Sequence, residues 1–343
     1  MSRAPLWRRK TRLLASFLFV LLAACQPQPR ELAFSGESLG TTYKVKVARF
    51  DGQAPAERFP ARIAEVLDAL DHKLSTYKSE SELNRLGRQP LGEPFVASDD
   101  LYRVLEISRL VHQLSDGAFD PTVRPLVDLW GFGPVPTGDR IPADDEIAAL
   151  RDRIGFDKIE LQPPNRVIRR GEVTLDLSAV AKGFIVDRVA AELLAMGASD
   201  FMVEIGGEVW VNGRRGDGAP WRIAVEVPRV EGGVERVLEV ADIGLATSGD
   251  YRNYFERDGV RYSHTLDPRT GKPITHRLAS ATVLAATTAE ADAIATALMV
   301  MGPEAGARWA AAHGLAVLLL VHDGEDFVEV PSEPMRRYLD QPR

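Results

Sequence analysis

The chain has 343 residues, of which 45% are hydrophobic, and 49 acidic against 42 basic side chains give it a formal net charge of -7. This acidic balance, with no lysine-rich or arginine-rich tract after residue 24, argues against a nucleic-acid partner, because binding to phosphate backbones needs clustered positive charge. The single cysteine, Cys25, excludes an intrachain disulfide.

Residues 1–24 have the pattern of a secretory signal peptide, with a basic start followed by the apolar stretch Leu13–Ala24. A helix that spans a bilayer needs ~20 apolar residues, so this shorter stretch favours export and cleavage over membrane spanning. The sequence Leu22–Cys25 resembles the lipobox of bacterial lipoproteins, in which the cysteine is acylated and becomes the new N-terminus. We therefore predict lipidation of Cys25, with a buried free cysteine as the structural alternative.

The remainder of the chain contains no internal repeat or low-complexity tract. After a tether over residues 25–30, we expect one globular domain over residues 31–343, with two lobes as the alternative. This length is enough for one large hydrophobic core or two smaller ones.

The first half of this domain is predicted to begin with a strand and continue with helices. Alternating side chains predict the strand over Thr41–Phe50. Apolar residues at three- and four-residue steps predict an amphipathic helix through Ile63–Leu74. Ser79–Glu82 has the spacing of a capping box and predicts a short helix that ends at Leu86. A second long helix is predicted over Ser98–Leu114.

The second half is predicted to be rich in strands, over Val173–Leu177, Phe201–Ile205, Val209–Val211, Trp221–Val227, Val237–Val240, Val260–Leu266 and Ala279–Ala285. Turn signals at Asn212–Gly213 and Asp267–Gly271 lie between neighbouring strands and favour antiparallel pairing. Runs of strands with helices on one side predict an α+β fold. The glycine spacing of a Rossmann or P-loop fold is absent from the sequence.

The loop Gly117–Thr122 follows the second long helix and contains the first candidate ligand-binding side chain. Glycine and proline alone mark only a turn, so a structural loop that plugs the core with aromatic residues is the simpler interpretation. On the functional interpretation, Asp120 accepts a hydrogen bond from a polar heterocycle or a ribose.

At Asp176–Gly183, a predicted strand runs directly into a helix whose apolar positions include Val186, Val189, Leu193 and Leu194. The start of a helix presents unpaired N–H groups and favours anions. With Ser178 and Lys182 nearby, this junction is a candidate site for a diphosphate, and a solvated helix lysine is the alternative. The pair Gly206–Gly207 lies between two predicted strands, where it indicates either a β-bulge or close approach to a ligand.

Thr287–Leu298 is predicted to form a helix that begins with a capping box and ends at Gly302. Asp292 and Thr296 are four residues apart and share one face of this helix. A carboxylate and a hydroxyl are hard oxygen ligands that suit Mg²⁺. The alternative is a solvent-facing aspartate beside a threonine bonded to its own helix.

His264 is predicted to lie near the end of a strand and is the best candidate for a general base. A histidine can accept a proton from a hydroxyl nucleophile near neutral pH. A partly buried imidazole bonded to a neighbouring carbonyl remains the alternative.

These motifs occur in the order found in the ApbE family of FAD:protein FMN transferases, and the resemblance covers nearly all of the chain after the signal peptide. The segments that carry it are Leu39–Tyr43, Ser75–Tyr77, Gly117–Thr122, Asp176–Gly183, Thr247–Tyr251, His264–Pro268 and Ala291–Leu298. The resemblance implies an α+β fold with mostly antiparallel sheets and an ApbE-like (T-fold-like) architecture. It also implies that FAD is cleaved in its diphosphate, that FMN passes to a threonine or serine of another protein, and that AMP is released.

The resemblance further implies roles for individual residues. Mg²⁺ would be held by the Ala179 carbonyl, Asp292 and Thr296, and His264 would act as the base. Tyr77 would pack on the flavin, and the other FAD contacts would be Ala118, Phe119, Asp120, Asp176, Lys182 and Leu266. Leu39 replaces a methionine that often packs on the flavin in the family, so we expect retained binding with altered affinity.

The expected setting is the periplasm, with a lipid anchor in the inner membrane. There the expected partners are acceptor domains of membrane-bound electron-transfer flavoproteins. Two other functions remain open from the sequence. One is a metal-dependent FAD pyrophosphatase with water as the acceptor, and the other is a non-catalytic flavin-binding lipoprotein.

Overall fold

A computed structural model describes residues 31–51, 55–133, 140–229, 233–250, 254–257 and 259–339 of the chain. The predicted signal peptide, Cys25 and the tether over residues 25–30 lie outside these ranges, as does Tyr251. Among the helices within the described ranges, none combines the length and the apolar character needed to cross a bilayer.

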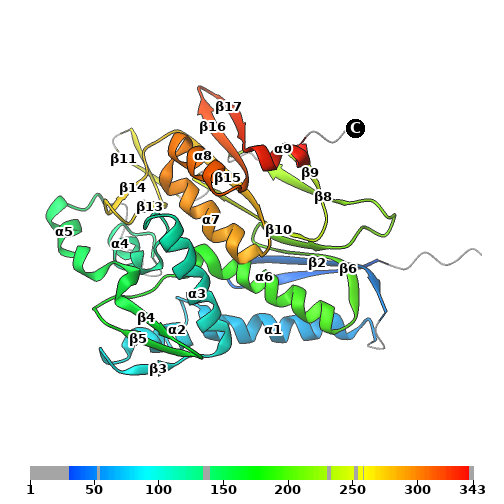
Figure 1. The fold of residues 1–343 in the computed structure, drawn as a ribbon, viewed down its shortest axis with the longest axis horizontal. Helices are drawn as coiled ribbons and strands as arrows, with labels where there is room; N and C mark the ends of the chain where they lie inside the picture. Colours follow the sequence, from blue (N-terminus) through cyan, green and yellow to red (C-terminus); the bar gives the residue numbers. More distant parts are fainter. Residues whose placement is uncertain are drawn as a thin grey trace, which may run out of the picture.

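An eight-stranded sheet runs through the whole molecule in the order β1-β2-β6-β7-β10-β15-β16-β17 (Figure 1). Every neighbouring pair of strands is antiparallel. The strands are β1 Leu32–Ser38, β2 Thr41–Phe50, β6 Ala198–Ile205, β7 Glu208–Asn212, β10 Ile243–Gly249, β15 Leu278–Ala285, β16 Ala316–Asp323 and β17 Asp326–Pro331. The predicted antiparallel α+β fold is confirmed.

One face of this sheet is covered by helices, and the largest hydrophobic core lies between them and the strands. The covering helices are α1 Arg58–Leu74, α3 Asp99–Leu114, α6 Ser178–Ala195, α7 Thr288–Met301 and α8 Pro303–Ala312. The stripe predicted for α1 is confirmed, because Ile63, Leu67 and Leu70 are all buried in this core. α7 packs directly on β10 and β15 and also contacts α6 (Figure 1).

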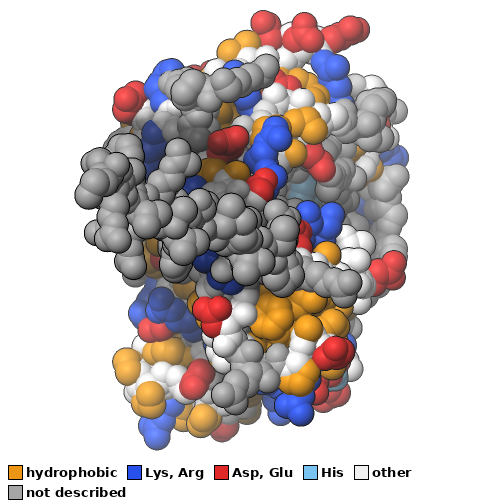
Figure 2. Space-filling model, turned by 90° about the vertical axis from the view of Figure 1, so that its right-hand side faces the viewer, with side chains coloured by type: hydrophobic (Ala, Val, Ile, Leu, Met, Phe, Trp, Pro, Cys, Tyr) orange, Lys and Arg blue, Asp and Glu red, His pale blue; other side chains and the backbone are white. Residues whose placement is uncertain are grey.

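The opposite face of the sheet packs on a hairpin and a helix, which are β8 Trp221–Glu226, β9 Val234–Val240 and α9 Glu333–Leu339. A second hydrophobic core fills this layer. On the face of the molecule shown in Figure 2, acidic and basic side chains are interspersed among the described residues.

Smaller elements surround one end of the helical layer. They are α2 Glu82–Arg88, β3 Pro94–Val96, η1 Pro121–Val123, α4 Arg124–Leu129, α5 Asp144–Ala149, η2 Arg151–Arg153, η3 Phe156–Lys158, β4 Ile159–Gln162, β5 Arg166–Arg169, β11 Tyr254–Arg257, β12 Val260–Ser263, β13 Leu266–Asp267 and β14 Lys272–Pro273. β3, β5 and β4 form a three-stranded sheet. A third core, which includes Leu126, Trp130 and Phe255, joins α4 to the strands around residue 260.

Two predicted strands differ in the structure. Val173–Leu177 forms no strand, because its backbone is tied to a loop: the Asp176 N–H donates to the Pro121 carbonyl at 2.7 Å. Val260–Leu266 divides into β12 and β13, because the Ser263 hydroxyl accepts a hydrogen bond from the Thr265 N–H and turns the chain between them.

Two local predictions about helices are also wrong. The short helix α2 is capped by the Ser81 hydroxyl, which accepts from the Asn84 N–H, instead of by Ser79. Glu82 does not complete a capping box, since its carboxylate accepts from the N–H and hydroxyl of Ser98. Leu194, predicted to lie in the apolar stripe of α6, is 49% exposed.

Candidate active site

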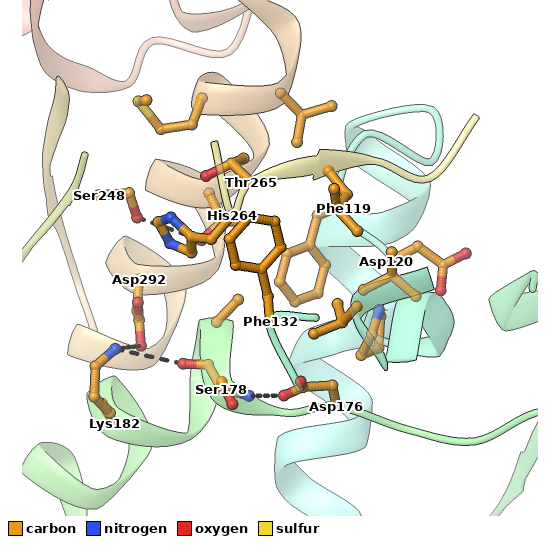
Figure 3. A pocket seen from close by; sticks show the side chains of 18 of the residues that line it. Phe119, Asp120, Phe132, Asp176, Ser178, Lys182, Ser248, His264, Thr265 and Asp292 are labelled. Atoms are coloured by element: carbon orange, nitrogen blue, oxygen red, sulfur yellow. Dashed lines mark hydrogen bonds and ion pairs between the residues drawn. The ribbon is translucent and has the colours of Figure 1, made fainter. Parts of the chain in front are cut away.

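A cavity of about 420 Å³ lies where the start of α6, one face of α7, the end of β10 and the loop after α3 meet (Figure 3). Gly206 and Glu208 close another part of its wall. The residues predicted from the sequence that line it are Tyr77, Ala118, Phe119, Asp120, Asp176, Ala179, Lys182, His264, Leu266, Asp292 and Thr296. The fold therefore brings together side chains from segments almost 220 residues apart in the chain (Tyr77 to Thr296).

The position of Asp292 depends on how α6 and α7 pack. Gly183 allows close approach, because a Cβ at this residue would lie 2.4 Å from the Thr288 carbonyl oxygen. Asp187 of α6 then accepts the N–H groups of Thr288 and Ala289 at 2.8 and 2.9 Å, which satisfies donors at the start of α7. Within α7, the Thr287 hydroxyl accepts from the Glu290 N–H, as the predicted cap requires.

Asp292 is 2% exposed and faces the start of α6. Its Oδ2 accepts a hydrogen bond from the Gly183 N–H at 3.0 Å and lies 3.9 Å from Lys182 Nζ. Burial raises the pKa of Asp292, and the ammonium of Lys182 opposes that effect. On the same face of α7, the Thr296 hydroxyl lies 3.3 Å from the Ser248 hydroxyl of β10.

Lys182 lies between two carboxylates. Its Nζ is 3.1 Å from Glu208 Oε1, and this pair is closer than the pair with Asp292. Burial by itself would lower the pKa of Lys182, but the attraction of Asp292 and Glu208 outweighs it and raises the pKa above its ordinary value. Lys182 is therefore a fixed positive charge in the cavity wall, as the diphosphate interpretation requires.

Glu208 is a site residue that the sequence prediction missed. It is 3% exposed, and burial raises its pKa although the ammonium of Lys182 opposes the shift. A glutamate at the start of a buried strand, immediately after two glycines, was the available signal. The signal was not specific, because only the tertiary structure places this side chain beside Lys182.

Gly206 and Gly207 form the turn of the β6–β7 hairpin. The register is continuous up to the pair Ile205 and Glu208, and both glycines have positive φ, 63° and 106°. The pair is therefore a tight turn and not a β-bulge. Because Gly206 lines the cavity, the interpretation of close approach to a ligand stays a prediction.

Asp120 and Asp176 shape the loops around the cavity. The Asp120 carboxylate accepts from the N–H and hydroxyl of Thr122 at 2.8 and 2.6 Å and from the Phe156 N–H at 3.2 Å. Burial raises the pKa of Asp120 in spite of these bonds. Asp176 accepts from the Ser178 N–H at 2.8 Å, which orders the first turn of α6.

Tyr77 and Leu39 occupy different surroundings. Tyr77 lines the cavity but is 75% exposed, so its ring stands at the mouth. Its loop is held by the Ser75 hydroxyl and by Asn84, which donates to the Lys78 carbonyl at 2.8 Å. Leu39 is not among the cavity-lining residues; it lies half-buried in the β1–β2 turn with a φ of 57°.

His264 follows the end of β12, as predicted, and projects into the cavity between Ser248 and Phe132 (Figure 3). The Phe132 ring meets its imidazole edge to face, with 6.3 Å between the ring centres. Phe132 is itself stacked on Phe255, which stacks on Tyr262. This aromatic row orients His264 from one side.

The residues present fit a magnesium ion. Asp292 and Thr296 present a carboxylate and a hydroxyl on one face of α7, and Ala179, at the start of α6, lines the same cavity. The Gly183 N–H of α6 donates to the Asp292 carboxylate and fixes its position beside the start of α6. No group of three or more His, Cys, Asp or Glu side chains in the described ranges could hold a metal. Mg²⁺ takes few protein ligands and completes its shell with water and phosphate.

Comparison with known proteins adds a family match. The model of the ApbE family matches residues 39–319. An FAD:protein FMN transferase of Vibrio cholerae serotype O1 is 41% identical over 96% of this chain and 98% of its own. One from Haemophilus influenzae is 39% identical over 95% and 96%. The apo crystal structure of the Pseudomonas stutzeri flavinyl transferase ApbE has a TM-score of 0.84 and 39% identity over 92% of this chain and 98% of its own.

Proposed function

The chain belongs to the ApbE family, and from this premise we propose that it is an enzyme that transfers FMN from FAD to a hydroxyl group of another protein. The observation that carries the proposal is the convergence of Lys182, His264, Asp292 and Thr296 on one cavity. These side chains supply a positive charge, a base and hard oxygen ligands. Transfer of a phosphoryl group from a diphosphate needs all three.

The reaction is a displacement at the phosphorus atom of the FMN half of FAD. The hydroxyl oxygen of a threonine or serine in the acceptor forms a new bond to this phosphorus. The bond from phosphorus to the bridging oxygen breaks, and that oxygen leaves with AMP. The hydroxyl proton passes to His264, which lines the cavity beside the end of β12.

The cavity wall would hold the diphosphate during this step. Lys182 and the positive end of the α6 helix dipole attract the negative phosphate oxygens. Asp292, Thr296 and the Ala179 carbonyl are the residues that would hold Mg²⁺, which when bound neutralises charge on the diphosphate. Tyr77, Phe119 and Leu266 offer apolar surface to the flavin or adenine rings.

We also propose that the enzyme acts at the periplasmic side of the inner membrane, with lipid on Cys25. The pattern of the first 25 residues supports this setting. The acceptors would be exported domains of membrane-bound electron-transfer flavoproteins, where a lipid anchor keeps the enzyme close to its targets.

The test is to incubate the purified protein with FAD, Mg²⁺ and a candidate acceptor domain, and to follow AMP and protein-bound flavin fluorescence. We expect AMP and labelled acceptor to form in equal amounts. AMP without labelled acceptor, for every acceptor tried, would indicate the pyrophosphatase. Bound FAD without AMP would indicate the non-catalytic flavin-binding protein.

A further inference from the structure

The wall of the cavity contains a group of three charged side chains from three elements: Lys182 of α6, Glu208 of β7 and Asp292 of α7. Both carboxylates are buried, and the ammonium lies within 4 Å of each of them. Asp292 and Lys182 have roles in the proposed reaction. Glu208 has none so far.

Keeping Glu208 in this place is costly. A buried carboxylate loses its hydration and is tolerated only when partners compensate. Its Oε1 has Lys182 as a partner at 3.1 Å, but its Oε2 is buried without a hydrogen-bond partner among the described residues. A side chain that costs stability in a cavity wall is a candidate for a function.

Glu208 is the nearer of the two carboxylates that flank Lys182. The lysine ammonium lies closer to Glu208 than to Asp292, at 3.1 Å against 3.9 Å. In the described part of the chain, these are the two carboxylates within 4 Å of Lys182 Nζ. Because the lysine stem is flexible, an ammonium released by Glu208 would move onto Asp292.

We propose that Glu208 is a positioning residue that holds Lys182 away from Asp292 and so keeps the Asp292 carboxylate available to a divalent cation. The proposal rests on the magnesium site of the proposed function. Without Glu208, a lysine–aspartate ion pair would compete with the cation for the same oxygens. With Glu208, one ammonium can face the diphosphate while Asp292 faces the metal.

A simpler, purely electrostatic effect of Glu208 would also favour cation binding at Asp292. A negative charge near the site attracts any cation, so the loss of Glu208 would weaken metal binding even if Lys182 never moved. The two effects differ in how Glu208 and Lys182 depend on each other. If Glu208 acts by charge alone, the effects of changing the two residues add in free energy. If Glu208 restrains Lys182, removing the lysine helps far more when Glu208 is absent.

The experiment measures Mn²⁺ binding to the full chain by the loss of the free Mn²⁺ signal in electron paramagnetic resonance, without FAD. It compares the wild type with E208Q, K182M and the double variant. We expect E208Q to weaken binding about tenfold or more. The single variant K182M should bind Mn²⁺ within about threefold of the wild type. In the E208Q background, K182M should instead strengthen Mn²⁺ binding about tenfold or more, a coupling typical of contacting residues.

Two further variants separate geometry from charge and from folding. E208D keeps the charge but has one methylene less reach, so we expect affinity several-fold below the wild type. Glu204 is the matched control, because it lies on the same hairpin, its carboxylate accepts from the Gly207 N–H, and it is not a cavity-lining residue. E204Q should bind Mn²⁺ like the wild type.

Additive effects in the cycle, wild-type affinity in E208D, or no Mn²⁺ binding by the wild type would each overturn the proposal. Failure of the proposed function has a different signature. If the four proteins show the coupled effects on Mn²⁺ binding but the wild type transfers no FMN, only the transferase function is refuted. If the wild type transfers FMN but the effects of E208Q and K182M on Mn²⁺ binding are additive, only the role of Glu208 is refuted.

Discussion

Asp292 is the residue on which the proposed metal site depends most. Asp292→Asn preserves the size of the side chain and its bond to the Gly183 N–H but removes the charge. We expect FMN transfer to fall by about a hundredfold or more, because the loss of a metal ligand removes the neutralisation of the diphosphate. Turnover and Mn²⁺ binding should be measured together. Wild-type turnover in this variant would refute the metal assignment.

His264 is the proposed base, and its substitution should separate chemistry from binding. His264→Gln should slow FMN transfer by about 10²–10⁴-fold, the range for loss of a general base. FAD affinity, measured by flavin fluorescence, should change little, because the variant keeps a polar side chain in the same wall. A variant that loses FAD binding and keeps its turnover at saturation would show that His264 binds the substrate instead.

The individual site residues were predictable to different degrees. Asp292, Thr296 and His264 stand in motifs whose order matches a family, and the structure places all three in one cavity. Glu208 was missed because its partner, Lys182, lies on another element, and no spacing in the sequence expresses that contact. Leu39 was placed beside the flavin by analogy alone; it lies outside the residues that line the cavity, and its contact with the flavin stays a prediction.

At the scale of elements, the site depends on the close packing of α6 against α7. Gly183→Ala would place a Cβ 2.4 Å from the Thr288 carbonyl oxygen, so one helix must shift. We expect a loss of about 1–3 kcal/mol in the free energy of unfolding, measured with denaturant. Activity should fall as well, because Asp292 moves with α7.

The matched control for this prediction is Gly87→Ala. Gly87 also lies in a helix, α2, but a Cβ there would meet nothing within 4 Å. Because alanine favours helix by up to about 1 kcal/mol over glycine, this variant should be as stable as the wild type or more so. Equal losses in both variants would contradict the packing argument.

Asp187, which supports the start of α7 from α6, gives this contact a pH dependence. Burial raises its pKa from 3.8 to about 6 in the folded state. Between about pH 4 and pH 6, the folded state therefore binds a proton that the unfolded state has released, so the contribution of Asp187 to stability falls as pH rises. The unfolding free energy of the wild type relative to Asp187→Asn should fall over this interval. A constant difference would contradict the raised pKa.

Helices were predicted better than strands. The helix α1 shows its buried face in a clear three- and four-residue pattern, α3 lies within its predicted range, and α7 carries its predicted cap. The strand β16 was not predicted. It is buried along most of its length, and a continuous apolar run does not distinguish a strand from a helix. Val173–Leu177 has strand-like residues, but a loop-to-loop bond to Pro121 determines its conformation.

At the scale of the whole molecule, the proposed lipid anchor on Cys25 should control location and not catalysis. Cys25→Ser should move the enzyme from the membrane fraction to the soluble fraction of the periplasm. Its rate of FMN transfer to a soluble acceptor should match that of the wild type, because the cavity is built from elements after residue 31. Loss of turnover in this variant in solution would contradict the separation of anchor and active site.

In the proposed reaction, the cavity passes FMN to a protein hydroxyl instead of to water. The most direct measurement is the intact mass of a purified acceptor domain after incubation with the enzyme, FAD and Mg²⁺, with AMP measured in the same sample. We predict a mass increase of one FMN phosphoester on a threonine or serine, with one AMP released for each. AMP released while the masses of all acceptors tested stay unchanged would contradict it.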